Sequence, residues 1–412
     1  MKLYQKEHGK TLKPISIRNN KNIIPKDVKC AHCGAPSEYL YYNDGIKRSQ
    51  IRCKICKNLC QLYSKETRGN AKYFCPFCNN ALVVWKKRKH FTVHKCYNKK
   101  CPEYLRNLNK LNFSEKILHS CSPYDFKLHY HFQEFHFAAD QLQAANPEKP
   151  KESNLTNIRN SLNTLCLALT FHVSFALSAR QTAAILKRVF KIKISYQSVI
   201  NYSQTAAYYC DLFNKHHSGK PDSINAGDET YIKISGKHAY TFLIISYPSL
   251  KITSYSVADS RDAQSAIAAL NPVISKLSSN EKFIIVTDGN PAYQSAINFF
   301  KMNSDDKLFV ELKKVIGLQN LDSQSEEYRK FKQIIERLNR TYKFHIKAAS
   351  GFKTKNGAVC LTALFVTNYN FLRPHGTLNY KPPVALDFLN EHDTIQQAWS
   401  KILNHAMRLD AS

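Results

Sequence analysis

Residues 283–293 read FIIVTDGNPAY, and this stretch decides the fold of the C-terminal half of the chain. A short run of apolar β-formers at its start predicts a buried strand. Asp288 follows the strand directly and opens onto Gly289 and a predicted helix. The carboxyl end of such a strand is a typical position for a metal ligand.

The sequence around this stretch alternates between two patterns. β-rich runs such as YTFLIIS (240–246) alternate with helical runs such as DAQSAIAALNPVISKL (262–277). Such alternation is the signature of an α/β unit. We expect residues 220–390 to form this unit and residues 391–412 to form a C-terminal helix.

A second carboxylate, Asp228, lies in INAGDETYIKI (224–234). We expect Asp228 at the start or edge of a strand that continues into a β hairpin through the turn at 235–237. Glu229 is expected to point away from Asp228, because adjacent side chains alternate in an extended segment.

A third carboxylate, Glu336, lies in FKQIIERLNRTYKFHI, a predicted helix. Ile335, Leu338 and Tyr342 make its buried stripe. Glu336, Arg340 and Lys343 share another face, because they are four and seven residues apart. That face would carry both a metal ligand and the cations that meet a phosphate.

Two strings make a resemblance specific: IIERLNRTYK (334–343) and LFVTNYNFLRPHGTLNYKPPVAL (364–386). They resemble the ends of catalytic domains in bacterial insertion-sequence transposases of the DDE type, relatives of retroviral integrases. The likeness covers roughly residues 222–388, and more weakly the helical segment before it. It implies an RNase H-like α/β catalytic domain with a mixed sheet.

The resemblance also implies roles for individual residues. Asp228, Asp288 and Glu336 match the first, second and third acids, which would be the catalytic residues and would bind Mg²⁺ or Mn²⁺. Lys343 is similar to the basic residue that many such enzymes place against DNA next to the scissile phosphate, and Arg340 shares its face. The implied partners are double-stranded DNA, as element ends and target, and further copies of the chain on that DNA.

The interval from Asp288 to Glu336 is longer than is typical of this group. The polar stretch LQNLDSQSEEYRKF (318–331) is the expected site of the extra length, which makes Glu326 and Glu327 rival third acids. Neither precedes an RLNR string, so Glu336 is favoured. Asp259 and Asp262 are expected to cap a helix and to pair with Arg261.

Three clustered carboxylates suit the cutting and joining of DNA strands. Two metal ions about 4 Å apart activate the attacking oxygen and neutralise charge on the leaving oxygen. Magnesium prefers oxygen ligands and keeps several waters, so a few carboxylates suffice. Without metal, the three acids would repel one another and at least one pKa would rise.

Most of the thirteen cysteines lie between Cys30 and Cys101. An odd total, in a basic chain whose N-terminus MKLYQKEHGK lacks an apolar region, indicates metal ligation rather than disulfides. Pairs of the form Cys-x2-Cys, about 15–20 residues apart, supply four thiolates to zinc. The first predicted set is Cys30, Cys33, Cys53 and Cys56, with Cys60 as a spare thiol.

A second set, Cys75, Cys78, Cys96 and Cys101, has a looser closing pair, and His90 or His94 could replace a cysteine. We expect zinc ribbons at residues 28–66 and 70–106, with about two structural zinc ions. Between the pairs of the second set, the stretch WKKRKHF combines basic residues with aromatic ones. Lys86, Lys87 and Arg88 are well placed to touch phosphates, although a solvated hairpin would have the same pattern.

Residues 178–204, SARQTAAILKRVFKIKISYQSVINYSQ, have the layout of a helix-turn-helix. A first helix would run from about 179 to 190, and Ser195 would cap the second. Tyr196, Gln197 and Asn201 would then face the bases of DNA. The alternative is a plain helical hairpin inside a bundle. The whole helical segment is expected to span residues 154–215.

The chain has 60 Lys and Arg against 31 Asp and Glu, a formal charge of +29, so nucleic acid is the leading partner. Residues 160–179 carry Asn, Thr, His and Ser, which favours a buried helix over a membrane span. No membrane association is expected, and the expected location is the prokaryotic cytoplasm at the nucleoid.

A basic tail (1–27) and a connector (107–153), which ends in the Pro-rich stretch NPEKPKES, complete a multidomain chain. The sequence thus predicts a DNA transposase that binds element ends and catalyses strand cleavage and strand transfer. A zinc-containing DNA-binding regulator, such as a domesticated transposase with an inactive site, is the alternative. An RNA-directed nuclease would keep the metal site and only hydrolyse.

Overall fold

The computed structural model describes residues 5–6, 9–16, 24–30, 32–43, 50–61, 71–122, 126, 128–137, 142–150, 155, 158, 160–278, 281–303, 309–315 and 323–411, except for the side chains of residues 60, 61, 323 and 324. The chain splits into two compact units. The first comprises residues 1–86 and 93–131, and the second comprises residues 87–92 and 132–412.

The Pro-rich stretch 146–153, in which the predicted connector ends, begins after this boundary. It therefore belongs to the second unit, and its described residues contact other parts of that unit. The backbone N–H of Glu148 donates to Asn356 Oδ1 over 3.1 Å, and Lys149 Nζ lies 3.5 Å from Asp410 Oδ2. Polar contacts of this kind anchor the stretch despite its linker-like composition.

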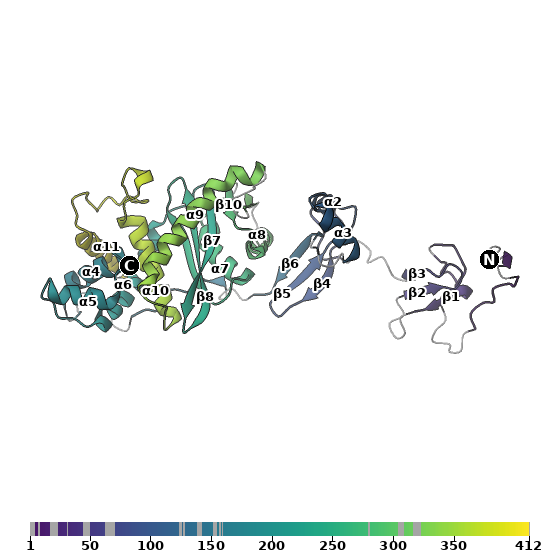
Figure 1. Cartoon of the computed structure of the whole chain (residues 1–412), viewed down its shortest axis with the longest axis horizontal. Coiled ribbons are helices and arrows are strands. Elements are labelled where there is room, and N and C mark those ends of the chain that lie inside the picture. The colour runs from purple at the N-terminus through teal and green to yellow at the C-terminus, as the bar shows by residue number, and fades with distance from the viewer. Residues whose placement is uncertain are drawn as a thin grey trace. The chain divides into compact units, whose positions relative to one another are not determined.

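A five-stranded mixed sheet forms the centre of the second unit (Figure 1). Its strands follow the spatial order β11 (Phe309–Lys314), β10 (Lys282–Thr287), β7 (Ile224–Ile234), β8 (Lys237–Tyr247) and β9 (Ile252–Ala258). β10 is parallel to β7 and β11, whereas β7, β8 and β9 pair in antiparallel fashion. The expected mixed sheet is confirmed.

Ser235 and Gly236 connect β7 to β8, as the sequence predicts. Both residues have positive φ, 49° and 77°, which is the backbone of a two-residue type I′ hairpin turn. Ile234 pairs directly with Lys237, so the hairpin closes without a bulge at its tip.

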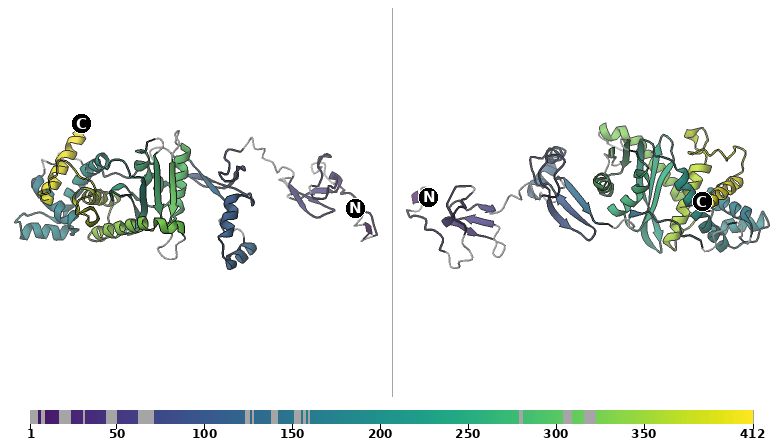
Figure 2. Two further views of the ribbon diagram at one scale, coloured as in Figure 1. Left: turned by 90° about the horizontal axis from the view of Figure 1, so that it is seen from above. Right: turned by 180° about the vertical axis from the view of Figure 1, so that it is seen from behind.

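Helices cover both faces of the sheet (Figures 1 and 2). On one face lie α7 (Ala263–Ile274) and α8 (Pro291–Asn303), and on the other lie α9 (Ser323–Lys347) and α10 (Lys355–Thr367). Successive residues of β8 alternate between the two cores: Phe242 and Ile244 face the first, and Leu243 and Ile245 face the second.

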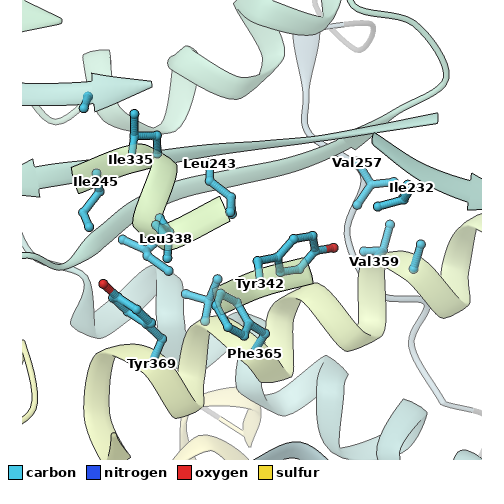
Figure 3. Packing of buried hydrophobic residues seen from close by; sticks show 14 of the residues in the cluster. Ile232, Leu243, Ile245, Val257, Ile335, Leu338, Tyr342, Val359, Phe365 and Tyr369 are labelled. Atoms are coloured by element: carbon cyan, nitrogen blue, oxygen red, sulfur yellow. The ribbon is translucent and has the colours of Figure 1, made fainter. Parts of the chain in front are cut away.

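The predicted stripe of α9 is confirmed, since Ile335, Leu338 and Tyr342 are buried at 1% exposure or less. Figure 3 shows these side chains packed between strand β8 and helix α10. Burial of each such side chain stabilises the fold by about 1.5–3 kcal/mol. This packing fixes the rotation of α9, and therefore the direction in which its polar face points.

A helical layer adjoins the sheet. It contains α4 (Leu162–Leu169), the π-helical segment η6 (Thr170–Ser174), α5 (Ala179–Arg188), α6 (Tyr196–His217), a second π-helical segment η7 (Asn368–Leu372) and α11 (Ile395–Ala411). Residues of α4, α6, α10 and α11 share one hydrophobic core around Trp399. The predicted helical segment and C-terminal helix are therefore joined to the α/β unit by packing.

Helices α5 and α6 match the predicted pair closely. Ser178 caps α5 in a capping box with Gln181, and the Ser195 hydroxyl accepts a hydrogen bond from the backbone N–H of Ser198 at the start of α6. The first helix ends at Arg188, slightly earlier than predicted. The C-terminal half of α6 is buried in the shared core, so α6 is also a bundle helix.

The first unit contains short strands around the cysteines. They are β1 (Leu40–Tyr42), β2 (Gln50–Cys53) and β3 (Leu59–Gln61), which form one antiparallel sheet after the 3-10 turn η2 (Ser37–Tyr39). Strands β4 (Val83–Lys87), β5 (Phe91–Lys95) and β6 (His131–Phe135) form a second sheet, whose residues 87–92 and 132–135 are assigned to the second unit. Helices α2 (Pro102–Asn109) and α3 (Phe113–Cys121) lie between β5 and β6 in sequence.

In the part of the chain that the structure describes, no helix combines the length and the apolar character that a membrane span requires. The stretch that begins near residue 160 forms α4, in which Leu165, Cys166 and Leu169 are fully buried.

Candidate active site

Three carboxylates meet where β10 ends beside β7. Asp228 and Glu229 lie on β7, and Asp288 directly follows β10. Parallel pairing of Val286 with Ala226 brings Asp288 level with Asp228. One carboxylate oxygen from each of the three residues lies within 4.8 Å of the others.

Two expectations about β7 were wrong. Asp228 lies in the interior of the central strand, paired with Leu243 of β8, rather than at a strand start or edge. Glu229 does not carry its carboxylate away from Asp228. Alternation fixes where a Cβ atom points, but the longer Glu side chain reaches the loop after β10, where Asn290 Nδ2 donates to its Oε1 over 2.7 Å.

Glu336 is linked to this group of acids by Lys332, whose ammonium lies near both Asp228 and Glu336. Lys332, one turn earlier on α9, is 6% exposed, and its Nζ lies 3.2 Å from Asp228 Oδ2 and 3.9 Å from Glu336 Oε1. Asn339 Nδ2 donates to the same Asp228 oxygen over 3.1 Å. The buried ammonium of Lys332 therefore lies between the first and third predicted acids.

Burial raises the pKa of the Asp228 carboxyl; Lys332 opposes that rise, and the charge of Asp288 adds to it. Burial also raises the pKa of Glu229, with the charges of Asp288 and Asp228 as further causes and the Asn290 hydrogen bond opposing them. Glu229 Oε2 is buried and has no hydrogen-bond partner within the part of the chain that the structure describes. A buried carboxylate oxygen of this kind favours a bound cation, because the cation would lower the free-energy cost of burying the negative charge.

The rival acids lie elsewhere. Glu326 is on α9 ten residues before Glu336, about 15 Å along the helix axis, and its Oε1 accepts a hydrogen bond from Arg329. Glu327 is exposed. Asp262 caps α7 as expected, because its Oδ1 accepts from the backbone N–H of Ser265 over 2.9 Å.

The expected pairing of Arg261 with these aspartates was wrong. Arg261 Nη1 lies 3.6 Å from Glu229 Oε1, and Asp259 instead accepts a hydrogen bond from Lys355. The Asp262 carboxylate is occupied by the N-cap, which leaves the buried, partly unpaired Glu229 as the acid that Arg261 meets.

The two cations predicted on α9 are exposed. Lys343 and Arg340 lie on the same helix as Glu336, so the helical spacing that placed them on one face is present. Arg340 also lines a pocket with residues of η6, η7 and α11.

The eight predicted zinc ligands form two groups of four, in each of which the sulfur atoms lie within 4.8 Å of one another. The distance from Cys30 Sγ to Cys56 Sγ is 3.6 Å, and that from Cys33 Sγ to Cys53 Sγ is also 3.6 Å. In the second group, the pairs Cys75–Cys101 and Cys78–Cys96 are 3.9 Å and 3.7 Å apart.

These distances fit zinc. A tetrahedral ion with metal–sulfur bonds of about 2.3 Å has sulfur–sulfur edges of about 3.8 Å. Among the described residues, neither histidine alternative joins the second group: His94 packs edge-on against Tyr73, and His90 lies against Phe137. The side chain of Cys60 lies outside the described residues.

The remaining predicted DNA-binding residues are exposed. Lys86 Nζ lies 4.2 Å from the centre of the Trp85 ring, and Lys87 and Arg88 follow at the turn between β4 and β5. On α6, Gln197 Nε2 donates to Asn201 Oδ1 over 2.9 Å, and Tyr196 lies under the guanidinium of Arg180. All six side chains are accessible to a partner.

Residues 223–360 match a family model described as a DDE domain, that of IS240 transposases. The chain carries a DDE-type transposase domain. The matched range begins just before β7 and ends within α10, so it includes all four acids of the site. A DDE-type transposase domain supports a general role in DNA transposition or integration.

Solved structures similar to this chain include the magnesium complex of the HTLV-2 integrase catalytic core domain, at 19% identity and a TM-score of 0.26, covering 40% of this chain and 95% of that chain. Integrase in a simian T-cell lymphotropic virus intasome with PP2A regulatory subunit B56 gamma matches at 16% identity and a TM-score of 0.30, covering 52% and 72%. No curated protein matches. These structural similarities are weak, and the domain assignment depends on the family model.

Proposed function

We propose that the protein is a DNA transposase that binds the ends of an insertion element and catalyses divalent-metal-dependent strand cleavage and strand transfer. The observation that carries this proposal is the convergence of Asp228, Glu229 and Asp288, with Glu336 linked to them through Lys332, inside a domain that matches the DDE model.

The acids of this site fit Mg²⁺ or Mn²⁺. They offer hard oxygen donors, and burial raises the pKa of two of them, Asp228 and Glu229. One oxygen of Glu229 has no hydrogen-bond partner among the described residues. Asp228, Asp288 and Glu336 would hold the metal. When bound, the metal supplies an activated water or 3′-hydroxyl and neutralises charge on the leaving oxygen.

The chain's own residues position these ligands. Asn339 and Lys332 fix one oxygen of Asp228, and the backbone N–H of Asn290 fixes Asp288 Oδ1 over 3.0 Å. The Asn290 side chain and Arg261 hold Glu229. The ammonium of Lys332 lies between the carboxylates of Asp228 and Glu336, where a metal ion shared by the two acids would lie. Lys332 must therefore move away when both acids bind one cation.

DNA recognition is assigned to the rest of the basic surface. Lys343 and Arg340 would contact the strand near the scissile phosphate, since they extend the face of Glu336. Lys86, Lys87 and Arg88 would contact phosphates from the β4–β5 turn, and Tyr196, Gln197 and Asn201 would approach bases from the start of α6. The two cysteine groups would hold structural zinc ions that stabilise the first unit.

We further propose that the protein acts as a homo-oligomer on DNA, in the prokaryotic cytoplasm at the nucleoid. The charge of +29 supports a polyanionic partner.

The test uses labelled DNA carrying the inverted repeats that flank the gene. Asp228→Asn, Asp288→Asn and Glu336→Gln should each abolish cleavage and joining in Mg²⁺ while leaving DNA binding largely intact. Asp259→Asn is the matched control, because Asp259 is an exposed acid of the same domain outside the site. If the unaltered chain binds this DNA but never cleaves it, the regulator is favoured. If it only hydrolyses nucleic acid, and only when an RNA directs it to the substrate, the nuclease is favoured.

A further inference from the structure

A pocket of about 700 Å³ opens beside the second half of α9. Its walls come from α9, the end of η6, the segment from η7 to Pro374, and the start of α11. Its size falls within the range of about 300–1,000 Å³ that is usual for small-molecule sites. The pocket lies wholly within the second unit and includes none of the four acids.

One wall of the pocket is cationic. Arg340 and Arg373 both line it, and its described lining residues include no Asp or Glu. Arg373 Nη1 is buried and has no hydrogen-bond partner among the described residues. A buried guanidinium N–H without a partner is costly, and an anionic oxygen would satisfy it.

The position of Arg373 explains part of the RPH string that the sequence singled out. The Arg373 guanidinium lies 5.8 Å from the centre of the Tyr369 ring, and the His375 ring meets the same tyrosine edge-on at 4.6 Å. Tyr369 is itself buried in the core under α9. The string therefore fixes a cation at the rim of the pocket.

The lining of the pocket also contains apolar and aromatic side chains. Phe344 is 64% exposed and Phe175 is 53% exposed, and both line the pocket with Leu372 and Pro374. Two exposed aromatic rings that line one pocket form an apolar surface that a ligand can cover. A ligand that combines a planar ring with a negative charge would contact both the aromatic and the cationic side chains of the lining.

Hydrogen bonds hold two lining residues of the pocket, Ser174 and Asn368, in place. Trp399 Nε1 donates to Ser174 Oγ over 3.1 Å, and the Ser174 hydroxyl donates to Asn368 Oδ1 over 2.7 Å. Both Trp399 and Asn368 are buried. The pocket is thus preformed, which lowers the ordering cost of binding.

The pocket also lies close to the acids along α9. Arg340 follows Glu336 by one helical turn, about 6 Å along α9, and Phe344 follows Arg340 by another. A strand with a phosphate at Glu336 that runs along α9 would reach the pocket with its neighbouring nucleotides.

We propose that this pocket binds one unstacked nucleotide of the DNA strand processed at the acids. Its base stacks on Phe344 and Phe175, and its phosphate meets Arg373 and Arg340. This inference rests on the proposed function, because it takes the ligand to be the DNA substrate. Single-stranded nucleic acids are commonly held in this way, by aromatic stacking beside a cationic groove.

The experiment measures binding of the full zinc-loaded chain to two probes in Mg²⁺-free buffer, where cleavage does not interfere. One probe is a duplex with a short single-stranded 3′ overhang, and the other has the same overhang made of abasic nucleotides. We expect the base-containing probe to bind about tenfold more tightly. The double variant F175A/F344A should lose this preference, whereas Arg373→Gln should weaken binding of both probes.

Tyr380→Ala is the matched control, because Tyr380 is 79% exposed, close to the RPH string, and does not line the pocket. A 5-iododeoxyuridine placed in the overhang should crosslink on irradiation to the peptide that contains Phe344 or Phe175. Equal binding of the two probes by the unaltered chain, or a full preference in F175A/F344A, overturns the proposal. Binding of free dAMP as tight as that of the overhang also overturns it, since the pocket would then serve a free nucleotide.

These outcomes are separable from those that test the proposed function. The pocket experiment measures binding and needs no catalysis. If the chain never cleaves DNA but binds the base-containing probe more tightly, only the transposase assignment is contradicted. A chain whose cleavage depends on the three acids, but which binds both probes equally, defeats only the pocket.

Discussion

The cysteine groups and the carboxylate site both bring candidate metal ligands together, but they assemble them differently. Each cysteine group comes from two short turns joined by a hairpin, with sulfur atoms 3.6–3.9 Å apart. The acids come from β7, β10 and α9, and a large hydrophobic core places them. Moreover, the acid site contains its own cation, Lys332.

Because of this difference, the two regions should depend on metal in different ways. The small ribbons bury little apolar surface, so zinc should contribute much of their folding free energy. The sheet and its helices fold around their own core, and Lys332 already offsets part of the charge of the acids. Removal of zinc should therefore unfold the ribbons. Removal of the divalent metal should abolish the reaction at the acids and leave the fold of the second unit intact.

The largest expected effect is on catalysis. Glu336→Gln, like Asp228→Asn and Asp288→Asn, should lower cleavage about a thousandfold or more, because loss of one ligand disturbs the whole metal site. Glu229→Gln tests the acid that the sequence left out, and we expect a partial loss, since Glu229 is held by Asn290 and Arg261.

Cleavage is measured with labelled element ends in Mg²⁺, and folding is checked by thermal denaturation. Glu326→Gln serves as control, as an exposed acid on the same helix. Full activity of Glu336→Gln with a dead Glu326→Gln would move the third acid to the start of α9. Full activity of all the acid variants would remove the enzymatic assignment.

The next effect concerns zinc. Purified protein should contain about two zinc ions, and the double variant C30S/C33S should contain about one, because each group needs its four thiolates. The thermal transition of the second unit should hardly change, since its core contains none of these cysteines.

Metal analysis by mass spectrometry together with calorimetry checks this prediction. The variant C166A provides a matched control, because Cys166 is a buried core cysteine far in sequence from both groups. Zinc near zero in folded protein, or unchanged zinc in C30S/C33S, would exclude the ribbon assignment.

A smaller effect is expected at Lys332. Lys332→Met removes the ammonium that lies between Asp228 and Glu336, so Mn²⁺ should bind several-fold more tightly and the metal-free protein should lose stability. Removal of one partner of a buried ion pair costs about 3–5 kcal/mol when the other charge stays buried. Mn²⁺ titration followed by electron paramagnetic resonance measures the affinity directly.

Lys330→Met is the control for this change, because Lys330 is exposed and lies over the rings of Tyr247 and Phe331 rather than beside the acids. Weaker Mn²⁺ binding by Lys332→Met would show that the lysine orients the acids for the metal instead of competing with it.

The sequence predicted much of this molecule where the information is local. The spacing of the cysteines predicted the two groups of four that the structure forms. Ser195 was correctly predicted as a cap, and the period of α9 predicted that Ile335, Leu338 and Tyr342 are buried. Strand alternation failed at Glu229, because it describes Cβ directions and not the reach of a long side chain toward Asn290 in another element.

The residues that the sequence reading missed act across elements. Lys332 and Asn339 lie on the α9 face of Glu336, four residues before it and three after it, and that spacing could have indicated them. Their contact with Asp228 depends on how α9 docks on β7, which no local pattern encodes. The contacts of Glu148 and Lys149 within the second unit were likewise not predicted, because they are tertiary.

The smallest expected effect compares single cations of the two regions. Lys343→Ala should weaken engagement of the cleaved end and leave partial activity, because Lys343 extends the face of Glu336 and contributes one phosphate contact. Lys86→Ala, near the end of β4, should weaken binding by a similar few-fold factor without changing cleavage of bound DNA. Each change should lower the slope of log affinity against log salt by about one.

Salt-dependent binding and single-turnover cleavage of bound complexes distinguish the two positions. Deleting residues 1–215 would not, because α4 and α6 share the core of α10 and α11, and the fragment would lose half of that core. Point changes leave the core intact. A cleavage defect in Lys86→Ala as large as that of Lys343→Ala would mean that the β4–β5 turn also contacts the reacting strand; equal salt slopes for both variants and the unaltered chain would mean that neither lysine contacts phosphate.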